Sequence, residues 1–170
     1  MRDFHYHNPT NLVFGRGKIR SLDDYVPIDA RVLIMAGGGS IKRNGIYDQV
    51  RQALGTRFVV EHWGIEPNPD LSSILPAKEI VTQHGCDFLL AVGGGSVVDA
   101  TKFLAGICRS PEDPVTLLTR GCRFTSALPL GVVLTVPGTG SESNPHGAIS
   151  YRAKRQKQLF SSPHCQPRFS

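Results

Sequence analysis

Short apolar runs alternate with amphipathic stretches along most of the chain. Short runs rich in apolar residues, which predict strands, lie at 31–35, 58–61, 88–92 and 131–135, and those at 31–35 and 88–92 predict strands buried on both faces. The segment 11–14 predicts one more short strand. Helix-like stretches lie between these runs, at 16–25, 41–54, 71–84 and 97–107. Strands that alternate with helices imply right-handed crossovers, so we expect an α/β, Rossmann-like fold with a mostly parallel sheet flanked by helices.

Caps and breakers predict where some of these helices begin and end. Pro67 and Pro69 disfavour a helix before Asp70, whose side chain can cap the helix that follows. That helix should end before Gly85, because glycine readily adopts the left-handed conformation of a helix cap. The Asn-Gly pair at 44–45 should interrupt the second helix-like stretch near its start.

Two strands run directly into the same tetrapeptide, Gly-Gly-Gly-Ser. We call these the first glycine turn, formed by Gly37, Gly38, Gly39 and Ser40, and the second glycine turn, formed by Gly93, Gly94, Gly95 and Ser96. Without side chains in the way, backbone N–H groups and the start of the next helix can bind an anion such as a phosphate. A third turn, 136–144, follows the strand at 131–135. Carboxyl ends of parallel strands share one edge, where we expect all three turns.

Standard motifs do not settle what these turns bind. Neither glycine turn completes G-x-G-x-x-G, since the sixth position is Lys42 in the first and Val98 in the second, and the G-x-x-x-x-G-K-[ST] phosphate loop is absent. Ser96 and Asp99 have the spacing of a capping box, so a well-capped helix that binds nothing stays open as an alternative. Two anion sites on one edge would instead suit the two ends of one dinucleotide.

The choice of dinucleotide can be argued from the end of the strand at 31–35. Enzymes that select NAD usually place a carboxylate at such a strand end to accept the ribose 2′-hydroxyl, and that charge would repel a 2′-phosphate. Here the segment reads MAGGGSIKR, without an acid. Ser40 can donate a hydrogen bond, and Lys42 and Arg43 supply positive charge. We therefore expect NADP(H) rather than NAD(H), with a merely solvated helix face at 42–43 as the alternative.

Composition narrows the class without naming a function. At 170 residues the chain is expected to form a single domain, 1–170. The net charge of +5 is concentrated at 42–43 and 152–157 without interleaved aromatic residues, which argues against a nucleic-acid partner. No apolar run approaches the roughly 18 residues of a membrane span, and the N-terminus lacks a signal-peptide core. We therefore expect a cytoplasmic protein with no membrane partner. The cysteines are far apart in the sequence, so we expect neither a zinc knuckle nor a disulfide framework from Cys86, Cys108, Cys122 and Cys165.

Four segments carry a resemblance to a known family. They are similar to segments in the amino-terminal half of the iron-containing, group III alcohol dehydrogenases. In chain order they are NPTNLVFGRGKI at 8–19, GIEPNP at 64–69, GGGSVVDATK at 93–102 and TVPGTGSESN at 135–144. The likeness is to the branch of NADPH-dependent aldehyde reductases and butanol dehydrogenases. It extends from about Phe4 to Pro167, and the pair GGGSxxD and TxPxTGSE in this order is specific.

This resemblance implies a fold like the amino-terminal domain of dehydroquinate synthase, and it implies roles for individual residues. The first glycine turn would lie by the adenosine ribose, and Gly94, Gly95, Ser96 and Asp99 would hold the pyrophosphate region. Thr135 and Thr139 would touch the phosphates and the nicotinamide ribose, and Lys157 would reach the cofactor. For 135–141 a hydroxyl-rich turn that caps a helix stays open as the alternative.

The catalytic metal of the resembled family, iron or zinc, is held by one Asp and three His of a helical second domain. That domain would begin just beyond residue 170, so this chain should lack catalytic and metal-ligand residues. His5 and His7 on a possible strand would make only a weak two-ligand site. We expect the chain to be inactive alone, to meet a small alcohol or aldehyde only with the second domain, and to form homo-oligomers. A non-catalytic nucleotide-binding or interaction module is the alternative.

Overall fold

The structure is a computed structural model that describes all residues except Met1, Arg2, Phe4 and Tyr6. The possible strand through His5 and His7 includes Tyr6, and the resemblance begins at Phe4, so these two expectations fall partly outside the described residues. The described part of the chain contains no helix that is long and apolar enough to cross a membrane.

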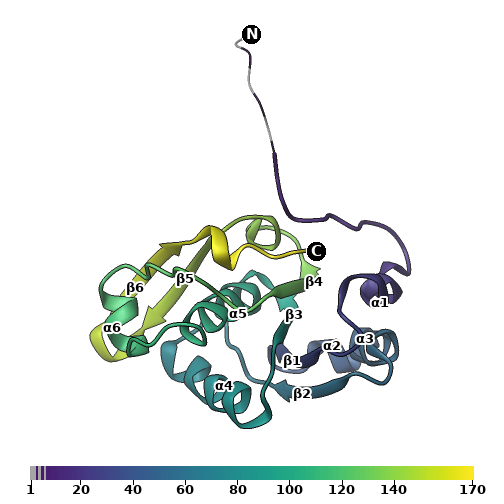
Figure 1. The fold of residues 1–170 in the computed structure, drawn as a ribbon, viewed down its shortest axis with the longest axis horizontal. Helices are drawn as coiled ribbons and strands as arrows, with labels where there is room; N and C mark the ends of the chain where they lie inside the picture. The colour runs from purple at the N-terminus through teal and green to yellow at the C-terminus, as the bar shows by residue number, and fades with distance from the viewer. Residues whose placement is uncertain (1–2, 4, 6) are drawn as a thin grey trace.

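A four-stranded parallel sheet forms the centre of the fold, in the order β2-β1-β3-β4 (Figure 1). Its strands are β1 (Arg31–Ala36), β2 (Phe58–His62), β3 (Phe88–Gly94) and β4 (Leu130–Val136). The central strands β1 and β3 are buried almost throughout. Helices cover both faces of the sheet, so the predicted α/β fold with a mostly parallel sheet is confirmed.

Alternate residues of the central strands supply two separate apolar cores. Leu33 and Leu89 pack on one face of the sheet with α4 (Leu71–His84) and α5 (Gly95–Ile107). Ile34 and Leu90 pack on the other face, against α1, α2 and α3. The helices of that face and the remaining short helices are η1 (Lys18–Ser21), α1 (Leu22–Tyr25), α2 (Ser40–Arg43), α3 (Ile46–Leu54), α6 (Pro114–Thr119), η2 (Ser141–Ser143), η3 (Arg152–Lys154) and η4 (Pro163–Cys165).

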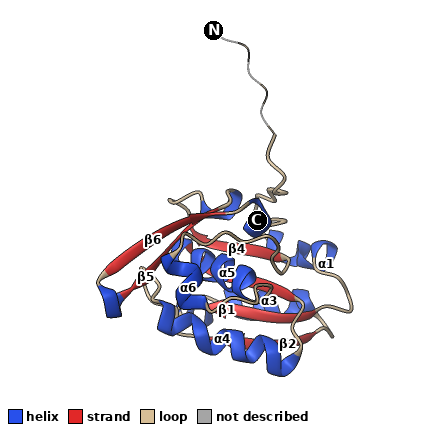
Figure 2. Cartoon of the chain, turned by 60° about the vertical axis from the view of Figure 1, so that its left-hand side comes forward, coloured by secondary structure: helices blue, strands red, loops and turns tan. Residues whose placement is uncertain are grey.

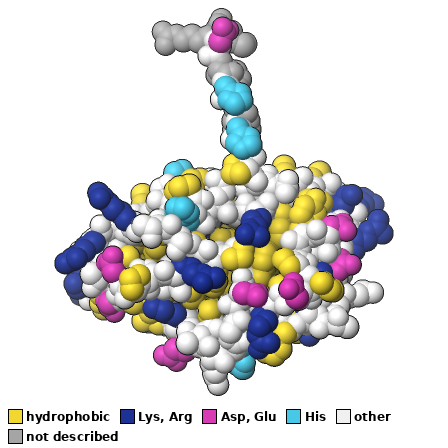
Figure 3. Space-filling view, viewed as in Figure 1, with side chains coloured by type: hydrophobic (Ala, Val, Ile, Leu, Met, Phe, Trp, Pro, Cys, Tyr) yellow, Lys and Arg dark blue, Asp and Glu magenta, His cyan; other side chains and the backbone are white. Residues whose placement is uncertain are grey.

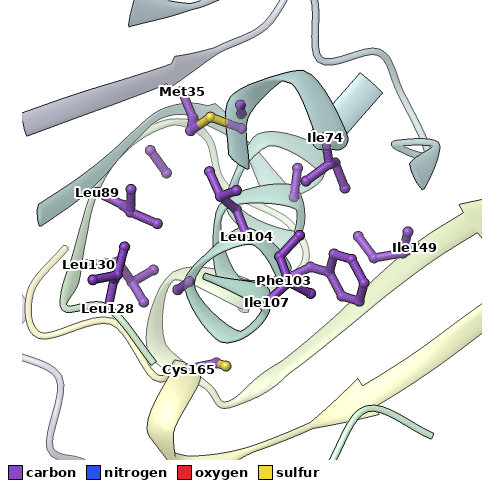
Figure 4. Packing of buried hydrophobic residues seen from close by; sticks show 14 of the residues in the cluster. Met35, Ile74, Leu89, Phe103, Leu104, Ile107, Leu128, Leu130, Ile149 and Cys165 are labelled. Atoms are coloured by element: carbon purple, nitrogen blue, oxygen red, sulfur yellow. The ribbon is translucent and has the colours of Figure 1, made fainter. Parts of the chain in front are cut away.

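An antiparallel hairpin, β5 (His146–Tyr151) and β6 (Gln156–Ser161), packs beside α5 (Figure 2). Phe103 of α5 meets Phe124 and Phe160 edge-on, with ring centres 5.9 and 5.8 Å apart. Ile149 and Cys165 close the same cluster (Figure 4). The apolar pattern did not predict this hairpin, which places the basic run 152–157 at its tip and on β6.

Several predicted element ends agree with the structure. The Asp70 side chain accepts a hydrogen bond of 3.0 Å from the Ser72 amide at the start of α4, and Gly85 ends that helix with a φ of 60°. Gly45, with a φ of 75°, separates α2 from α3. The predicted strand at 11–14 is wrong, because only Asn11 forms a bridge, to Phe169.

Candidate functional site

The two glycine turns lie side by side at the carboxyl edge of the sheet. They follow β1 and β3, which pair in parallel with Ala36 opposite Val92. The Val97 side chain lies between them: a Cβ placed on Gly37 would lie 3.7 Å from its Cγ2, and one placed on Gly93 would lie 2.6 Å from the same atom. The expectation that both turns share one edge is therefore confirmed.

The second glycine turn is tightly packed. A Cβ on Gly95 would lie 2.5 Å from the Thr139 Oγ1, closer than such atoms approach in real structures. β3 runs on through Gly94 with an irregularity between Gly93 and Gly94, so the glycines do not end the strand as predicted. Packing against α5 and the third turn thus requires glycine here, whether or not a ligand binds.

The capping-box alternative for Ser96 and Asp99 is wrong. Gly94 is the N-cap of α5, and no side chain caps the helix start. The Ser96 Oγ instead accepts a 3.2 Å hydrogen bond from the Asn68 amide. Both side chains therefore serve contacts outside the helix, and the amides of its first turn receive no side-chain cap.

The first glycine turn is open by contrast. A Cβ on Gly38 or Gly39 would meet no atom within 4 Å, and Gly38 and Ser40 are exposed. Gly39 has a φ of 91°, which favours glycine for conformational reasons. At Gly38 neither packing nor a positive φ requires glycine, so the space above it is free for a ligand.

Asp99 carries an acceptor that the described residues do not satisfy. Its Oδ2 accepts a 3.1 Å hydrogen bond from the Ala148 amide, whereas the buried Oδ1 finds no partner in the described chain. Burial raises the pKa of Asp99, although the nearby Ser141 side chain and the hydrogen bond from the Ala148 amide act in the opposite direction. An unpaired buried acceptor beside the second glycine turn fits a hydroxyl donor such as a ribose.

Asn68, which the sequence interpretation did not single out, joins two of the predicted residues. Its backbone amide donates a hydrogen bond to the Ser96 Oγ, and its side-chain Oδ1 accepts a 2.8 Å hydrogen bond from the Lys157 Nζ. Lys157 thus reaches the second glycine turn from β6. Asn68 has a φ of 54°, a conformation that asparagine tolerates better than most residues. The Pro-Asn-Pro sequence was the available indication that this residue has a special position.

Lys102, also not predicted, is a fully buried cation in α5. Its Nζ donates to the His146 carbonyl at 2.7 Å and to the Asn144 Oδ1 at 3.1 Å, and the Asn144 Nδ2 donates to the Gly140 carbonyl at 2.8 Å. Desolvation lowers the pKa of Lys102 to about 8, although the charge of Asp99 acts in the opposite direction. Lys102 therefore ties the third turn to α5.

The two predicted threonines stand in different settings. Thr135 lies on β4 opposite the irregularity at the second glycine turn, where Gly93 pairs with Leu134 and Gly94 with Val136. Thr139 is exposed, and its Oγ1 accepts a 3.2 Å hydrogen bond from the Ser141 amide. Hydroxyls therefore stabilise the turn at Thr139, but no side chain caps the short helix η2, whose N-cap is Gly140, so the helix-capping alternative is wrong there.

An apolar pocket lies elsewhere. A cavity of about 470 Å³ opens between residues 12–25 and β4, and none of the twelve predicted cofactor residues lines it. The candidate site is an open edge of the sheet instead. Among the described residues, no three His, Cys, Asp or Glu side chains form a group that could hold a metal ion.

Fold and site together define an α/β domain of the open, parallel class, with glycine-rich turns at the carboxyl edge of its sheet. A family model described as iron-containing alcohol dehydrogenase matches residues 9–170. The chain belongs to this family.

Relatives and solved structures agree with this assignment. The chain is 49% identical over 173 residues to the NADPH-dependent aldehyde reductase YqhD of Escherichia coli, covering all of this chain and 45% of that protein. It is 35% identical over 173 residues to the NADH-dependent butanol dehydrogenase B of Clostridium acetobutylicum, again over its whole length and 44% of that protein. A crystal structure of E. coli YqhD superimposes with a TM-score of 0.94 at 48% identity, over 98% of this chain and 44% of that one. The chain thus spans less than half the length of these relatives.

Proposed function

We propose that residues 1–170 form the NADP(H)-binding half of an iron-containing alcohol dehydrogenase that interconverts an alcohol and an aldehyde by hydride transfer. The observation that carries this proposal is the adjacency of the two glycine turns, with Val97 between them and an unpaired Asp99 oxygen beside the second. One turn alone would suit any phosphate, whereas two on one edge suit the two ends of a dinucleotide.

Each predicted residue has a task in this arrangement. Backbone amides at Gly94, Gly95 and Ser96, at the start of the 13-residue helix α5, would bind the pyrophosphate. Asp99 would accept a hydrogen bond from a ribose next to the pyrophosphate, and Lys157 would reach the cofactor. Thr135 and Thr139 would touch the phosphates and the nicotinamide ribose, and Gly37–Ser40 would receive the adenosine ribose. The bound nicotinamide supplies the hydride chemistry, and the protein binds and orients it.

NADP(H) is the proposed cofactor because no acid follows β1 and Ser40 is exposed at the first glycine turn. The relatives differ on this point, since one is named for NADPH and another for NADH. Calorimetric titration of the purified chain with NADPH, NADH and ADP-ribose tests the proposal. Tighter binding of NADPH is expected. Equal or tighter binding of NADH would contradict the preference, and equal binding of adenine nucleotides that lack nicotinamide would favour a non-catalytic nucleotide-binding module.

Reduction of an aldehyde is proposed to need metal ligands beyond those that residues 1–170 provide. In the family a metal ion stabilises the developing alkoxide, and the described residues offer no group of three ligands for it. An assay of this chain with NADPH, a short aldehyde and added iron or zinc should show no turnover above a protein-free control. Metal-dependent turnover would overturn this part of the proposal.

Self-association is the last part of the proposal. Leu12 is 72% and Phe14 92% exposed, beside the pocket that β4 lines. Hydrophobic side chains also lie open on the face shown in Figure 3. Exposed apolar patches of this kind mark interaction surfaces. Light scattering should give a mass above 18.5 kDa, the mass of one chain, and Phe14→Ser should lower it.

A further inference from the structure

Four side chains form a polar and aromatic cluster beside the first glycine turn, which we call the Trp63 cluster: Lys42, Tyr47, Glu61 and Trp63. They come from α2, α3 and the end of β2. The segment that carries Trp63 is fixed to the turn by backbone hydrogen bonds, from the Gly64 amide to the Gly37 carbonyl at 3.3 Å and from the Ile65 amide to the Ala36 carbonyl at 3.1 Å. The cluster is therefore anchored where the ribose is proposed to bind.

Glu61 is the carboxylate at the end of β2, where an acid could serve a ribose 2′-hydroxyl. Both of its oxygens are already engaged: Oε1 accepts from the Tyr47 hydroxyl, and Oε2 accepts a 2.8 Å hydrogen bond from the Trp63 Nε1. The hydrogen bond to Glu61, together with burial, raises the pKa of Tyr47, so the phenol remains a donor near neutral pH. Two neutral donors thus hold the acid in place.

Lys42 is held in a different way. Its Nζ lies 4.0 Å from the centre of the Trp63 ring and 5.4 Å from that of Tyr47. None of the ion pairs among the described residues involves Lys42, so its charge is not neutralised by a carboxylate at salt-bridge distance. A ring face attracts a cation without cancelling its charge, and donation from the indole N–H to Glu61 polarises the ring further toward the cation.

We propose that Trp63 sets the preference for a phosphorylated ribose, by holding the Lys42 ammonium beside the first glycine turn and by tying the Glu61 carboxylate to its indole N–H. The inference rests on the proposed function and deepens it. The ligand group that it assigns to Lys42 is a phosphomonoester, the 2′-phosphate of NADP(H). Trp63 is a positioning residue here, since it acts through Lys42 and Glu61.

Three variants separate these contributions. Trp63→Leu removes the ring and the N–H donor, and we expect it to weaken NADPH binding about three- to tenfold without weakening NADH binding, since the released Glu61 can accept from a ribose 2′-hydroxyl. Trp63→Phe keeps a ring face for Lys42 and should retain more of the preference. Lys42→Met removes the charge itself and should weaken NADPH binding about tenfold or more, without changing NADH binding. Lys78→Met, a lysine of α4 on the opposite face of the sheet, is the matched control.

The measurement is the ratio of dissociation constants for NADPH and NADH, determined by calorimetry for each folded variant. Because the sequence contains a single tryptophan, quenching of Trp63 fluorescence on NADPH addition gives a second readout in the unaltered chain. An unchanged ratio in both Trp63→Leu and Lys42→Met would overturn the inference while leaving the proposed function intact. If Trp63→Leu fails to fold, an unchanged ratio of the NADPH and NADH dissociation constants in Lys42→Met is enough by itself to overturn the inference. Absence of binding of either nucleotide to the unaltered chain would instead refute the proposed function.

Discussion

The two glycine turns share a sequence but not a structural setting. At the second turn, Val97 and Thr139 occupy the space that a side chain on Gly93 or Gly95 would need, and hydrogen bonds join Ser96 through Asn68 to β6. At the first turn, Gly38 and Gly39 face open space. The comparison shows that identical tetrapeptides can have different structural roles. The second turn is a rigid anchor built into the core, and the first is an adaptable surface where selectivity can be set.

Replacing Lys102, the buried lysine that ties the third turn to α5, should have the largest effect on the stability of the fold. The pKa of Lys102 is about 8 in the folded chain and near 10.5 when unfolded, so the unfolded chain binds the extra proton between these pH values. Stability of the unaltered chain should therefore rise relative to that of Lys102→Met as pH increases from 8 to 10.5, by about 3 kcal/mol. Urea unfolding of both proteins at pH 7.5 and pH 10 measures this difference. A stability difference that does not change with pH would contradict the assigned pKa and its cause.

Alanine at one packed position of the second turn and one open position of the first tests the comparison directly. Gly93→Ala forces a Cβ to within 2.6 Å of the Val97 side chain and should destabilise the fold by about 1–3 kcal/mol. Gly38→Ala meets no atom within 4 Å, so it should change stability by less than about 0.5 kcal/mol. It should nevertheless weaken NADPH binding, because the new methyl occupies the proposed ligand space. Equal losses of stability in both variants, measured by thermal unfolding, would show that the turns do not differ in this way.

Asp99→Asn should leave stability almost unchanged while weakening cofactor binding. Its raised pKa means that the ionised, desolvated carboxylate destabilises the fold at pH 7, a penalty that falls as pH drops through the folded pKa. Asparagine keeps an acceptor for the Ala148 amide, so its melting temperature at pH 7 should equal or exceed that of the unaltered chain. Loss of the charged hydrogen bond to a ribose hydroxyl should weaken NADPH binding about tenfold. Unaltered NADPH affinity in a folded Asp99→Asn variant would remove Asp99 from the site.

Much of the fold was predictable because its strongest elements have local causes. The central strands β1 and β3 are buried apolar runs, and α4 begins and ends at residues with clear capping chemistry. The hairpin of β5 and β6 was not predictable in the same way. Its outer strand, QKQLFS, lacks a continuous apolar run, and its stability comes from Phe160 packing on Phe103, a contact between distant parts of the chain.

For the candidate site, the sequence indicates which turns meet but not how they are held. The apolar pattern implies that the turns share one edge, whereas their adjacency follows from the observed strand order, in which β1 neighbours β3. The bridging role of Asn68 and the burial of Lys102 depend on tertiary contacts with β6 and with the third turn. No spacing rule reveals such contacts. The residues that position the predicted cofactor-binding side chains can therefore be identified only from the structure.

The central claim is that both glycine turns bind opposite ends of one NADP(H) molecule. Backbone amide resonances of the ¹⁵N-labelled chain, followed during titration with NADPH, test it most directly. The account predicts that Gly38 and Ser40, together with Gly94 and Ser96, shift along curves that fit a single dissociation constant. Shifts confined to one turn, or different dissociation constants for the two, would contradict it.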